Sequence, residues 1–437
     1  MSNKENWTDL CLGDLADGFR GVSYQPGHLL SEQTDQSVTL LRATNIQNGR
    51  LDFSDVQIVP QSIVKQSQKM KTGDIAVCMS NGSKRLVGKS AQFNGEHSAE
   101  YTVGAFCAIF RPKPNSDQAF VKQLFESEAF QAHIDISLAG SAINNLKNSD
   151  VESVPFCVPP KPTQSKIATI LQTIDNAIAQ TEALIEKYSL VKAGMMHDLF
   201  TRGLTPDGKL RPPREEASDL YKETPIGWIP TEWEQPELQD VCGHLITYGI
   251  VQAGPDIEGG VPYIRTGDMS GESLVKDKML RTSRKIANAF KRSEVKTGEI
   301  VCAIRATVGK VLIVPEELDG ANLTQGTARI APKDDVENRF VAWGFRSSAV
   351  QKSIMLCIKG TTFNEITLGD LRELPFSIPT TEHEQRLIAD RLDQCQHLVD
   401  AERSKLAKLL KEKKGLMHDL LTGEVLVKVD DPEAAHV

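Results

Sequence analysis

The sequence predicts an α+β fold in which two β-rich domains are separated by two long antiparallel coiled-coil helices, related by a pseudo-twofold internal repeat. Three observations predict it. A stretch with heptad-spaced apolar residues occurs twice, 221 positions apart. Each copy follows a block of short apolar runs divided by Gly, Asn, Pro and Ser. The two blocks share short motifs in the same order, and a repeat this long indicates two equivalent halves.

The chain of 437 residues is expected to contain six segments. They are a first domain at 1–160, a spacer helix at 161–203, a linker at 204–223, a second domain at 224–380, a second spacer helix at 381–424 and a C-terminal tail at 425–437.

The first block is expected to be rich in strands, because its apolar runs are short and bounded by turn residues. These runs are Val38–Leu41, Val56–Val59, Ile75–Met79 and Gly104–Phe110. One helix is predicted from Asp117 to about Ser137, where apolar residues recur at helical spacing. An extended strand bounded by prolines, at 154–160, is expected to close the block.

The apolar residues of the two long helices advance by alternating steps of four and three, which is a heptad seam. The first helix ends near Gly203, a typical C-terminal glycine. Each long helix is expected to be about 50 Å long at 1.5 Å per residue. We expect antiparallel pairing, because a parallel pair would require the second block to span the whole helix length. The seam residues are Ile167, Leu171, Ile174, Ile178, Ile185 and Tyr188, then Ile388, Leu392, Val399, Leu406 and Leu409.

The linker is polar, rich in proline and charge, and expected to be exposed. After it, the second block repeats short motifs of the first while the sequences between them differ. This pattern favours two modules with one scaffold and different targets. The matched motifs are Arg42–Asn45 with Arg265–Asp268, Lys71–Ile75 with Lys296–Ile300, Val87–Lys89 with Val308–Lys310, and Gly140-Ser141 with Gly360-Thr361.

Composition excludes several classes of protein. No run of about 18 apolar residues is present, so no membrane span is expected. The N-terminus lacks the apolar core of a secretory signal. The eight cysteines never form CxxC, so we expect reduced, largely buried thiols in a cytoplasmic protein and no metal site.

Motifs for covalent chemistry are missing, and we expect no catalytic residue and no cofactor bound by this chain. Gly82 to Ser90 is close to a phosphate-binding loop, but five residues separate its glycines where that motif needs four. The sequence has no GxGxxG after an expected strand and no HExxH. A basic loop facing a phosphate backbone is the better interpretation of Lys84, Arg85 and Lys89.

The net charge of −8 conceals two basic stretches, one in each block. Residues 65–89 contain six lysines or arginines and one acidic residue. Residues 276–296 contain eight lysines or arginines and two acidic residues. We expect them to occupy the same place in the plan of each block. Lys and Arg neutralise phosphates, whereas Arg, Asn and Gln can also read base edges.

Residues in or near these stretches are candidates for binding double-stranded DNA. Any one of them is equally consistent with a solvated surface charge, but the two stretches together favour DNA. Two different blocks on a rigid spacer predict an asymmetric target with an unread gap, its halves about one helical turn or more apart. The candidates are Arg42, Asn45, Asn81, Ser83, Lys84, Arg85 and Lys89, then Arg265, Arg284, Lys285, Lys291, Arg292, Arg305 and Lys310.

The whole chain resembles the specificity (S) subunit of type I restriction–modification systems. The resemblance rests on the order block–helix–block–helix and on Pro-Ile-Gly-Trp-Ile-Pro-Thr-Glu-Trp at 225–233. It also rests on the helix starts at Gln164 and Gln385 and on the Met-His-Asp-Leu helix ends. No single motif is specific, but together they identify the family.

The resemblance implies that each block is a target recognition domain for one half of a bipartite DNA site. It implies that the paired helices measure the gap and dock two modification (methyltransferase) subunits. Restriction (endonuclease and translocase) subunits complete such complexes. S-adenosylmethionine, ATP and Mg would be bound by those partners and not by this chain.

Two other interpretations remain open from the sequence. One is a coiled-coil scaffold whose two globular blocks bind protein partners. The other is an enzyme in its own right, such as a nuclease. The basic stretches and the different loops of the two blocks favour DNA recognition over both.

Overall fold

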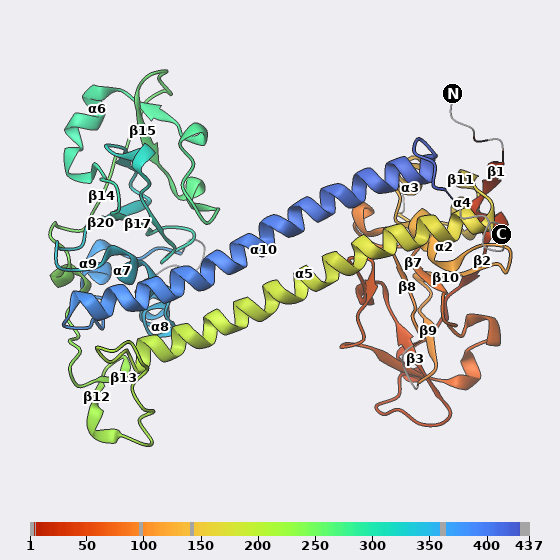
Figure 1. The fold of residues 1–437 in the computed structure, drawn as a ribbon, viewed down its shortest axis with the longest axis horizontal. Helices are drawn as coiled ribbons and strands as arrows, with labels where there is room; N and C mark the ends of the chain where they lie inside the picture. The colour runs from red at the N-terminus through yellow and green to blue at the C-terminus, as the bar shows by residue number, and fades with distance from the viewer. Residues whose placement is uncertain (1–3, 5, 96–98, 140–143, 359–363, 429–437) are drawn as a thin grey trace, which may run out of the picture. The chain divides into compact units, whose positions relative to one another are not determined.

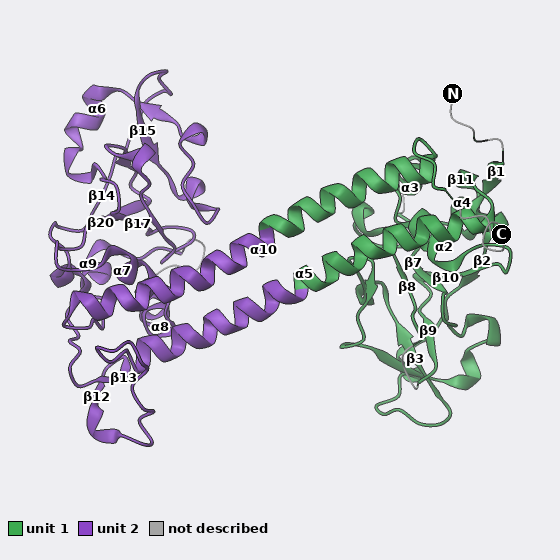
Figure 2. Ribbon diagram, in the orientation of Figure 1, with its two compact units in different colours: residues 1–182, 404–437 green, residues 183–403 purple. Residues whose placement is uncertain are grey.

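The computed structural model describes residues 4, 6–95, 99–139, 144–358 and 364–428. The chain divides into two compact units, residues 1–182 with 404–437 and residues 183–403 (Figure 2). The division passes through both long helices, so each unit holds one β-rich block and part of each helix. The mixed helix and strand content confirms the predicted α+β class. The Gly-Ser and Gly-Thr motifs at 140–141 and 360–361, and the tail beyond 428, lie outside the described residues.

The first block is built on two main sheets. A four-stranded antiparallel sheet has the order β2-β10-β7-β8, and a three-stranded sheet has the order β6-β3-β9. Strand β3 runs parallel to β9 and antiparallel to β6. The strands are β1 Thr8–Cys11, β2 Ala16–Arg20, β3 Ser37–Leu41, β4 Ile46–Gln47, β5 Arg50–Leu51, β6 Gln57–Pro60, β7 Ile75–Cys78, β8 Ser90–Gln92, β9 Tyr101–Val103, β10 Cys107–Pro112 and β11 Pro155–Val158.

The second block repeats this topology. Its four-stranded sheet has the order β14-β20-β17-β18, and its three-stranded sheet has the order β16-β15-β19 with β15 parallel to β19. The internal repeat in the sequence is therefore a repeat of the fold. The strands are β12 Tyr221–Thr224, β13 Gly227–Pro230, β14 Thr247–Tyr248, β15 Val261–Ile264, β16 Arg281–Thr282, β17 Ile300–Ala303, β18 Val311–Ile313, β19 Asn322–Leu323 and β20 Thr327–Ile330.

Short helices pack beside the sheets, and one prediction about them is wrong. The single helix expected from Asp117 to Ser137 is two helices, α2 and α3. The hydroxyl of Ser127 accepts the Phe130 N–H at 3.2 Å, which starts a new helix at that point. The short helices are α1 Leu12–Leu15, α2 Gln118–Phe125, α3 Glu128–Ala139, α4 Asn148–Glu152, α6 Arg284–Ala289, α7 Asn338–Phe345, α8 Ser348–Cys357 and α9 Leu368–Arg372.

The two long helices are α5, Lys161–Thr201, and α10, Glu382–Thr422, each of 41 residues. Their seam residues are buried where each helix leaves its block and half-buried further along. Ile167 and Leu171 join the core of the first block, and Ile388 and Leu392 join that of the second. The buried seam residues are Ile167, Leu171, Ile174, Ile178, Ile388, Leu392 and Val399, and the half-buried ones are Ile185, Tyr188, Leu406 and Leu409.

The long helices run antiparallel, as predicted (Figure 1). In the first unit, Lys413 near the end of α10 forms an ion pair of 2.7 Å with Asp175 near the start of α5. In the second unit, Lys192 near the end of α5 donates to Gln396 near the start of α10 at 2.6 Å. Lys192 and Lys413 are 221 positions apart, as are Asp175 and Gln396. The same contact is therefore made twice, as a pseudo-twofold axis requires.

A buried glutamine fastens the start of each long helix to its own block. The side-chain oxygen of Gln164 accepts the Asp117 N–H, and its amide nitrogen donates to the Pro159 carbonyl, both at 2.9 Å. Gln385 makes the same two bonds, both at 2.9 Å, with the backbone of Glu337 and Pro379. The repeated motif thus has a structural role in both halves.

An arginine paired with a buried carboxylate also recurs in each four-stranded sheet. Arg111 on β10 donates to both carboxylate oxygens of Asp74 at 2.9 and 2.7 Å. Arg329 on β20 pairs in the same way with Glu299. Each carboxylate also accepts the backbone N–H three residues before it, so the shared Lys-Thr-Gly-acid motif forms the turn before the central strand.

The segment at 204–223, predicted to be an exposed linker, is largely exposed but is anchored at a few buried residues. Arg211 is buried, and β12 already begins at Tyr221. The Glu384 carboxylate on α10 explains this packing. It accepts from the Leu204 N–H at 2.7 Å, from Arg211 at 2.6 and 3.2 Å, and from Trp233 Nε1 at 3.0 Å. One carboxylate therefore joins α10, the end of α5 and the start of the second block.

All eight cysteines are free thiols. Cys78, Cys107 and Cys302 are buried as predicted, whereas Cys157 and Cys357 are only half-buried. Burial raises the pKa of the Cys107 and Cys302 thiols to about 12, so both are protonated at neutral pH. Among the described helices, none combines the length and apolar character needed to cross a membrane.

We predict that Glu384→Ala lowers the free energy of unfolding by about 3–5 kcal/mol, because it leaves Arg211 and the Trp233 indole buried without their acceptor. Urea denaturation would measure the change. Glu382→Ala is the matched control, since this exposed glutamate pairs with Arg386 at the surface and should cost at most about 1 kcal/mol. Equal losses for the two variants would contradict the role of Glu384.

Candidate nucleic-acid interface

The loop after β7 carries most of the candidate residues of the first block. The side chain of Asn81 accepts the Ser83 N–H at 3.0 Å, which turns the chain before a short 3₁₀ helix at Lys84–Leu86. Gly88 then adopts a φ of +86° that favours glycine. The next element is strand β8 and not a helix, so the loop lacks the helix N-terminus of a phosphate-binding loop.

Three cations on this loop differ in their availability. Lys84 is exposed but donates to the Asp135 carbonyl at 3.2 Å. Arg85 is exposed and Lys89 is half-buried. Among the described residues, neither Arg85 nor Lys89 has a side-chain hydrogen bond or ion pair. These two charges are therefore available to an external anion.

The turn of Arg42 and Asn45 has a structural role, which corrects the prediction that Asn45 reads a base. Asn45 is 2% exposed, and its side chain accepts the Arg42 N–H at 2.8 Å. Its amide donates to the carbonyls of Asp52 and Asp55 at 2.9 and 2.8 Å. Arg42 pairs with the Asp55 carboxylate at 2.7 Å. The Asn45 amide is fully used inside the block.

The second block forms the same turn with a charged partner. The carboxylate of Asp268 accepts the Arg265 N–H at 2.9 Å and pairs with the Arg265 guanidinium at 3.0 and 2.8 Å. These hydrogen bonds to Asp268 raise the pKa of Arg265 above its ordinary value. The guanidinium is partly exposed, but its charge is already balanced.

The loop after β17 matches the loop after β7, yet its cations are engaged. Arg305 donates twice to the Glu365 carboxylate, at 3.0 and 2.9 Å. Lys310 donates to the Ser270 carbonyl at 3.0 Å. Equivalent loops in the two blocks therefore present different surfaces.

The free cations of the second block lie instead on α6 and on the 3₁₀ helix at Lys291–Ser293. The four are exposed and, within the described part of the chain, have no side-chain partner. The buried hydroxyl of Ser293 donates a hydrogen bond of 2.6 Å to the side-chain oxygen of Asn322, which anchors this segment. The four residues are Arg284, Lys285, Lys291 and Arg292.

The two basic stretches share one place in the plan of the blocks, the turn at Lys71 and Lys296, but the other cations are distributed differently. Among the candidate residues, the unpaired Arg85 and Lys89 follow β7, whereas Arg284, Lys285, Lys291 and Arg292 precede β17, its equivalent strand. The reason is that loops vary in length and composition between blocks while the sheets retain their order.

One turn brings the separate candidate loops of each block together. In the second unit, a Cβ on Gly326 would lie 2.6 Å from the Thr266 hydroxyl and 4.0 Å from the Arg305 Cβ. In the first unit, the Gly104 N–H donates to the Leu41 carbonyl, and the Phe106 carbonyl accepts from Met79 and Ser80. Sequence reasoning missed Phe106, whose side chain is 69% exposed. The sequence feature that could have drawn attention to Phe106 is the difference between the blocks at this position, where the second block has Gly326.

A groove of about 1720 Å³ in the first unit is lined by the block and by the long helices. Arg85 and Lys89 line it, as do two lysine–carboxylate pairs in its wall. Burial acts to raise the pKa of Asp175, but Lys122 and Lys413 together lower it below its ordinary value. Asp175 is thus ionised at neutral pH and balances the lysines, so Arg85 and Lys89 supply the uncompensated positive charge.

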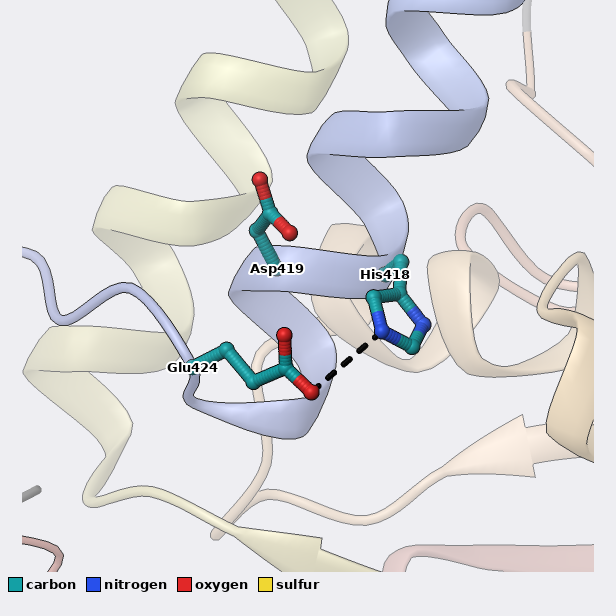
Figure 3. A group of neighbouring side chains, drawn as sticks. All are labelled: His418, Asp419 and Glu424. Carbon is teal, nitrogen blue, oxygen red and sulfur yellow. Dashed lines mark ion pairs between the residues drawn. The ribbon is translucent and has the colours of Figure 1, made fainter.

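A group that could hold a metal ion, within the described residues, comprises His418, Asp419 and Glu424 (Figure 3). His418 and Glu424 are exposed and lie 3.4 Å apart, an ion pair when the imidazole is protonated. An exposed ion pair at a helix end accounts for this geometry, and we assign no metal to it.

Comparison with known proteins adds independent evidence. The family model of the type I restriction modification DNA specificity domain matches residues 4–187 and again residues 230–411. The type I restriction enzyme EcoKI specificity subunit of Escherichia coli strain K12 is 26% identical over 407 residues, covering 91% of this chain and 83% of that protein.

A putative type I restriction enzyme MjaX specificity subunit of Methanocaldococcus jannaschii is 29% identical over 402 residues, covering 89% of this chain and 87% of that protein. The crystal structure of a type I restriction–modification system S subunit from M. genitalium superposes with a TM-score of 0.57 at 15% identity. That match covers 95% of this chain and 96% of the other, and shows a shared fold. With two copies of the DNA specificity domain spanning most of its length, this chain belongs to the family of type I restriction–modification specificity subunits.

Proposed function

We propose that this chain is a non-catalytic DNA-recognition subunit that reads an asymmetric bipartite site, with one half-site for each block. The observation that carries the proposal is the repeat of one scaffold with different loops. The sheet orders, the glutamine anchors and the buried arginine pairs recur in both halves. The unpaired candidate cations differ in position, with Arg85 and Lys89 after β7 in the first block and Arg284, Lys285, Lys291 and Arg292 before β17 in the second. Two blocks with the same fold and different surface loops are suited to bind two different DNA sequences.

The free cations support contact with the DNA backbone in both blocks. Arg85 and Lys89 in the first block, and the Arg284–Arg292 segment in the second, carry charges that no described side chain neutralises. Such charges gain free energy by releasing counterions from DNA. Residues whose charges are already paired, such as Arg265 and Arg305, contribute less to this term.

In this proposal the long helices set the gap between the half-sites. A helix of 41 residues measures roughly 60 Å at 1.5 Å per residue. Exposed leucines on the long helices also suit partner docking, and they include Leu190, Leu398 and Leu410. Two modification subunits, and restriction subunits where present, would supply S-adenosylmethionine, ATP and Mg chemistry from outside this chain.

The central test is the salt dependence of DNA binding by the chain assembled with its modification subunits. We expect affinity for a random duplex to fall steeply, by at least about tenfold, between 50 and 200 mM salt, because phosphate contacts release counterions. Fluorescence anisotropy would measure it. A flat response would exclude DNA contact and favour the protein-binding scaffold, and DNA cleavage or methylation by the isolated chain would favour an enzyme.

Charge removal in one block should affect one half-site. We predict that Arg85→Ala with Lys89→Ala reduces the salt slope by about 2 and weakens binding to duplexes carrying only the first half-site. Arg284→Ala with Lys285→Ala should act on the second half-site alone. Lys209→Ala is the matched control, because this exposed lysine is paired with Asp207. Equal losses on both half-sites would show that the loops are misassigned.

The spacer can be shortened within the two long helices while the sequences of both blocks stay unchanged. We predict that deleting the equivalent heptads at 180–186 and 401–407 together shortens the gap by about 10 Å, or roughly three base pairs. Both half-site sequences should persist, because the recognition loops are unchanged. Mapping of methylated motifs in host DNA would report the result. Altered half-site sequences with an unaltered gap would refute the role of the helices.

A further inference from the structure

Phe106 is an apolar ring in a polar part of the first block. It lies in the turn between β9 and β10 and is 69% exposed. The other eleven aromatic residues of this block are buried or half-buried. An aromatic side chain exposed to this extent suggests a contact with another molecule, provided that its surroundings indicate which kind.

The turn that carries Phe106 is firmly held. The Cys107 N–H donates to the Gly104 carbonyl at 2.8 Å, which closes the turn. The Phe106 carbonyl accepts from the backbone N–H groups of Met79 and Ser80, at 2.8 and 3.1 Å. Only the ring projects outward, from the point where the loop that carries Arg85 and Lys89 begins.

The surroundings of this turn are polar and cationic. The Asn81 N–H donates to the Asn144 carbonyl at 3.3 Å, and Arg20 donates to the Asn145 side chain at 2.9 Å. The same loop continues to the free charge of Arg85. An apolar protein partner would have to desolvate these groups, whereas DNA offers phosphates to the cations and apolar base edges to the ring.

The second block provides an internal comparison. Its equivalent turn is closed by the same bond, from Thr327 N–H to the Thr324 carbonyl, and Gly326 occupies the position of Phe106. A side chain there would meet the Thr266 hydroxyl, since a Cβ would lie only 2.6 Å away. At the position of Thr266 the first block has Ala43, which lacks that hydroxyl. A side chain at this turn of the second block would therefore require Thr266 to shift, whereas the first block has no hydroxyl at that position.

We propose that Phe106 makes an apolar contact with the bases of the half-site read by the first block, and that the second block lacks this contact. The inference rests on the proposed function. Phenylalanine has two ways to read bases, against the thymine methyl group in the major groove or as a wedge between base pairs. In either case the ring adds sequence discrimination to one half-site only.

The test uses the full chain assembled with its modification subunits and the bipartite motif that methylation mapping reports for the unaltered chain. Duplexes with each single base change in either half-site would be assayed for methylation. With Phe106→Ala, we expect discrimination at one or two adjacent positions of the first half-site to fall by roughly tenfold. Discrimination in the second half-site should not change. Phe106→Leu should retain part of it.

A matched control and the state of the assembly distinguish a base contact of Phe106 from a protein contact. Leu245→Ala removes an equally exposed apolar side chain from the second block and should leave the first half-site unaffected. Unchanged discrimination with Phe106→Ala, or an equal loss at both half-sites, would overturn the inference. Loss of assembly with the modification subunits would assign Phe106 to a protein contact and also overturn it. If the unaltered chain yields no bipartite motif, the proposed function itself fails, independently of Phe106.

Discussion

The structure depends on the attachment of each long helix to its own block through one buried side-chain amide. Gln164 and Gln385 each bridge two backbone groups, one in the strand exit before the helix and one at the start of a short helix in the block. A buried amide with both functions satisfied has one orientation, because any rotation leaves a donor or acceptor unpaired. The direction of the helix is thereby linked to the block that carries the recognition loops.

Within the second unit, Glu384 adds a further constraint at the neighbouring position. Its carboxylate receives bonds from the end of α5, from Arg211 and from the Trp233 indole. The first unit shares the tryptophan contact, since Trp7 lies against Gly423 as Trp233 lies against Gly203, but it has Thr163 at the position of Glu384. The chain therefore repeats its architecture without repeating every contact, and the connecting segment is part of the fold of the second unit.

The recognition role follows from how the blocks use their charges. The arginines of the blocks have two different roles. Arg111, Arg265 and Arg329 are paired with carboxylates and hold turns or sheets in place. Arg85 and Arg284 have no such partner among the described residues. The paired arginines stabilise a scaffold common to both halves, and the free ones, with Phe106, give each half its own surface.

Much of this protein was predictable from local patterns. Heptad spacing determined two long helices, and the 221-residue repeat determined their equivalence, because apolar periodicity and internal similarity are properties of the sequence alone. The α+β class and the family resemblance followed in the same way. The availability of a side chain was not predictable, because it depends on partners distant in sequence. Asn45 meets Asp55, Arg305 meets Glu365 and Arg211 meets Glu384 only after folding. The sequence alone therefore determined the scaffold and its duplication, whereas the tertiary structure decided which charges and which aromatic ring remain free, because pairing and burial depend on long-range contacts.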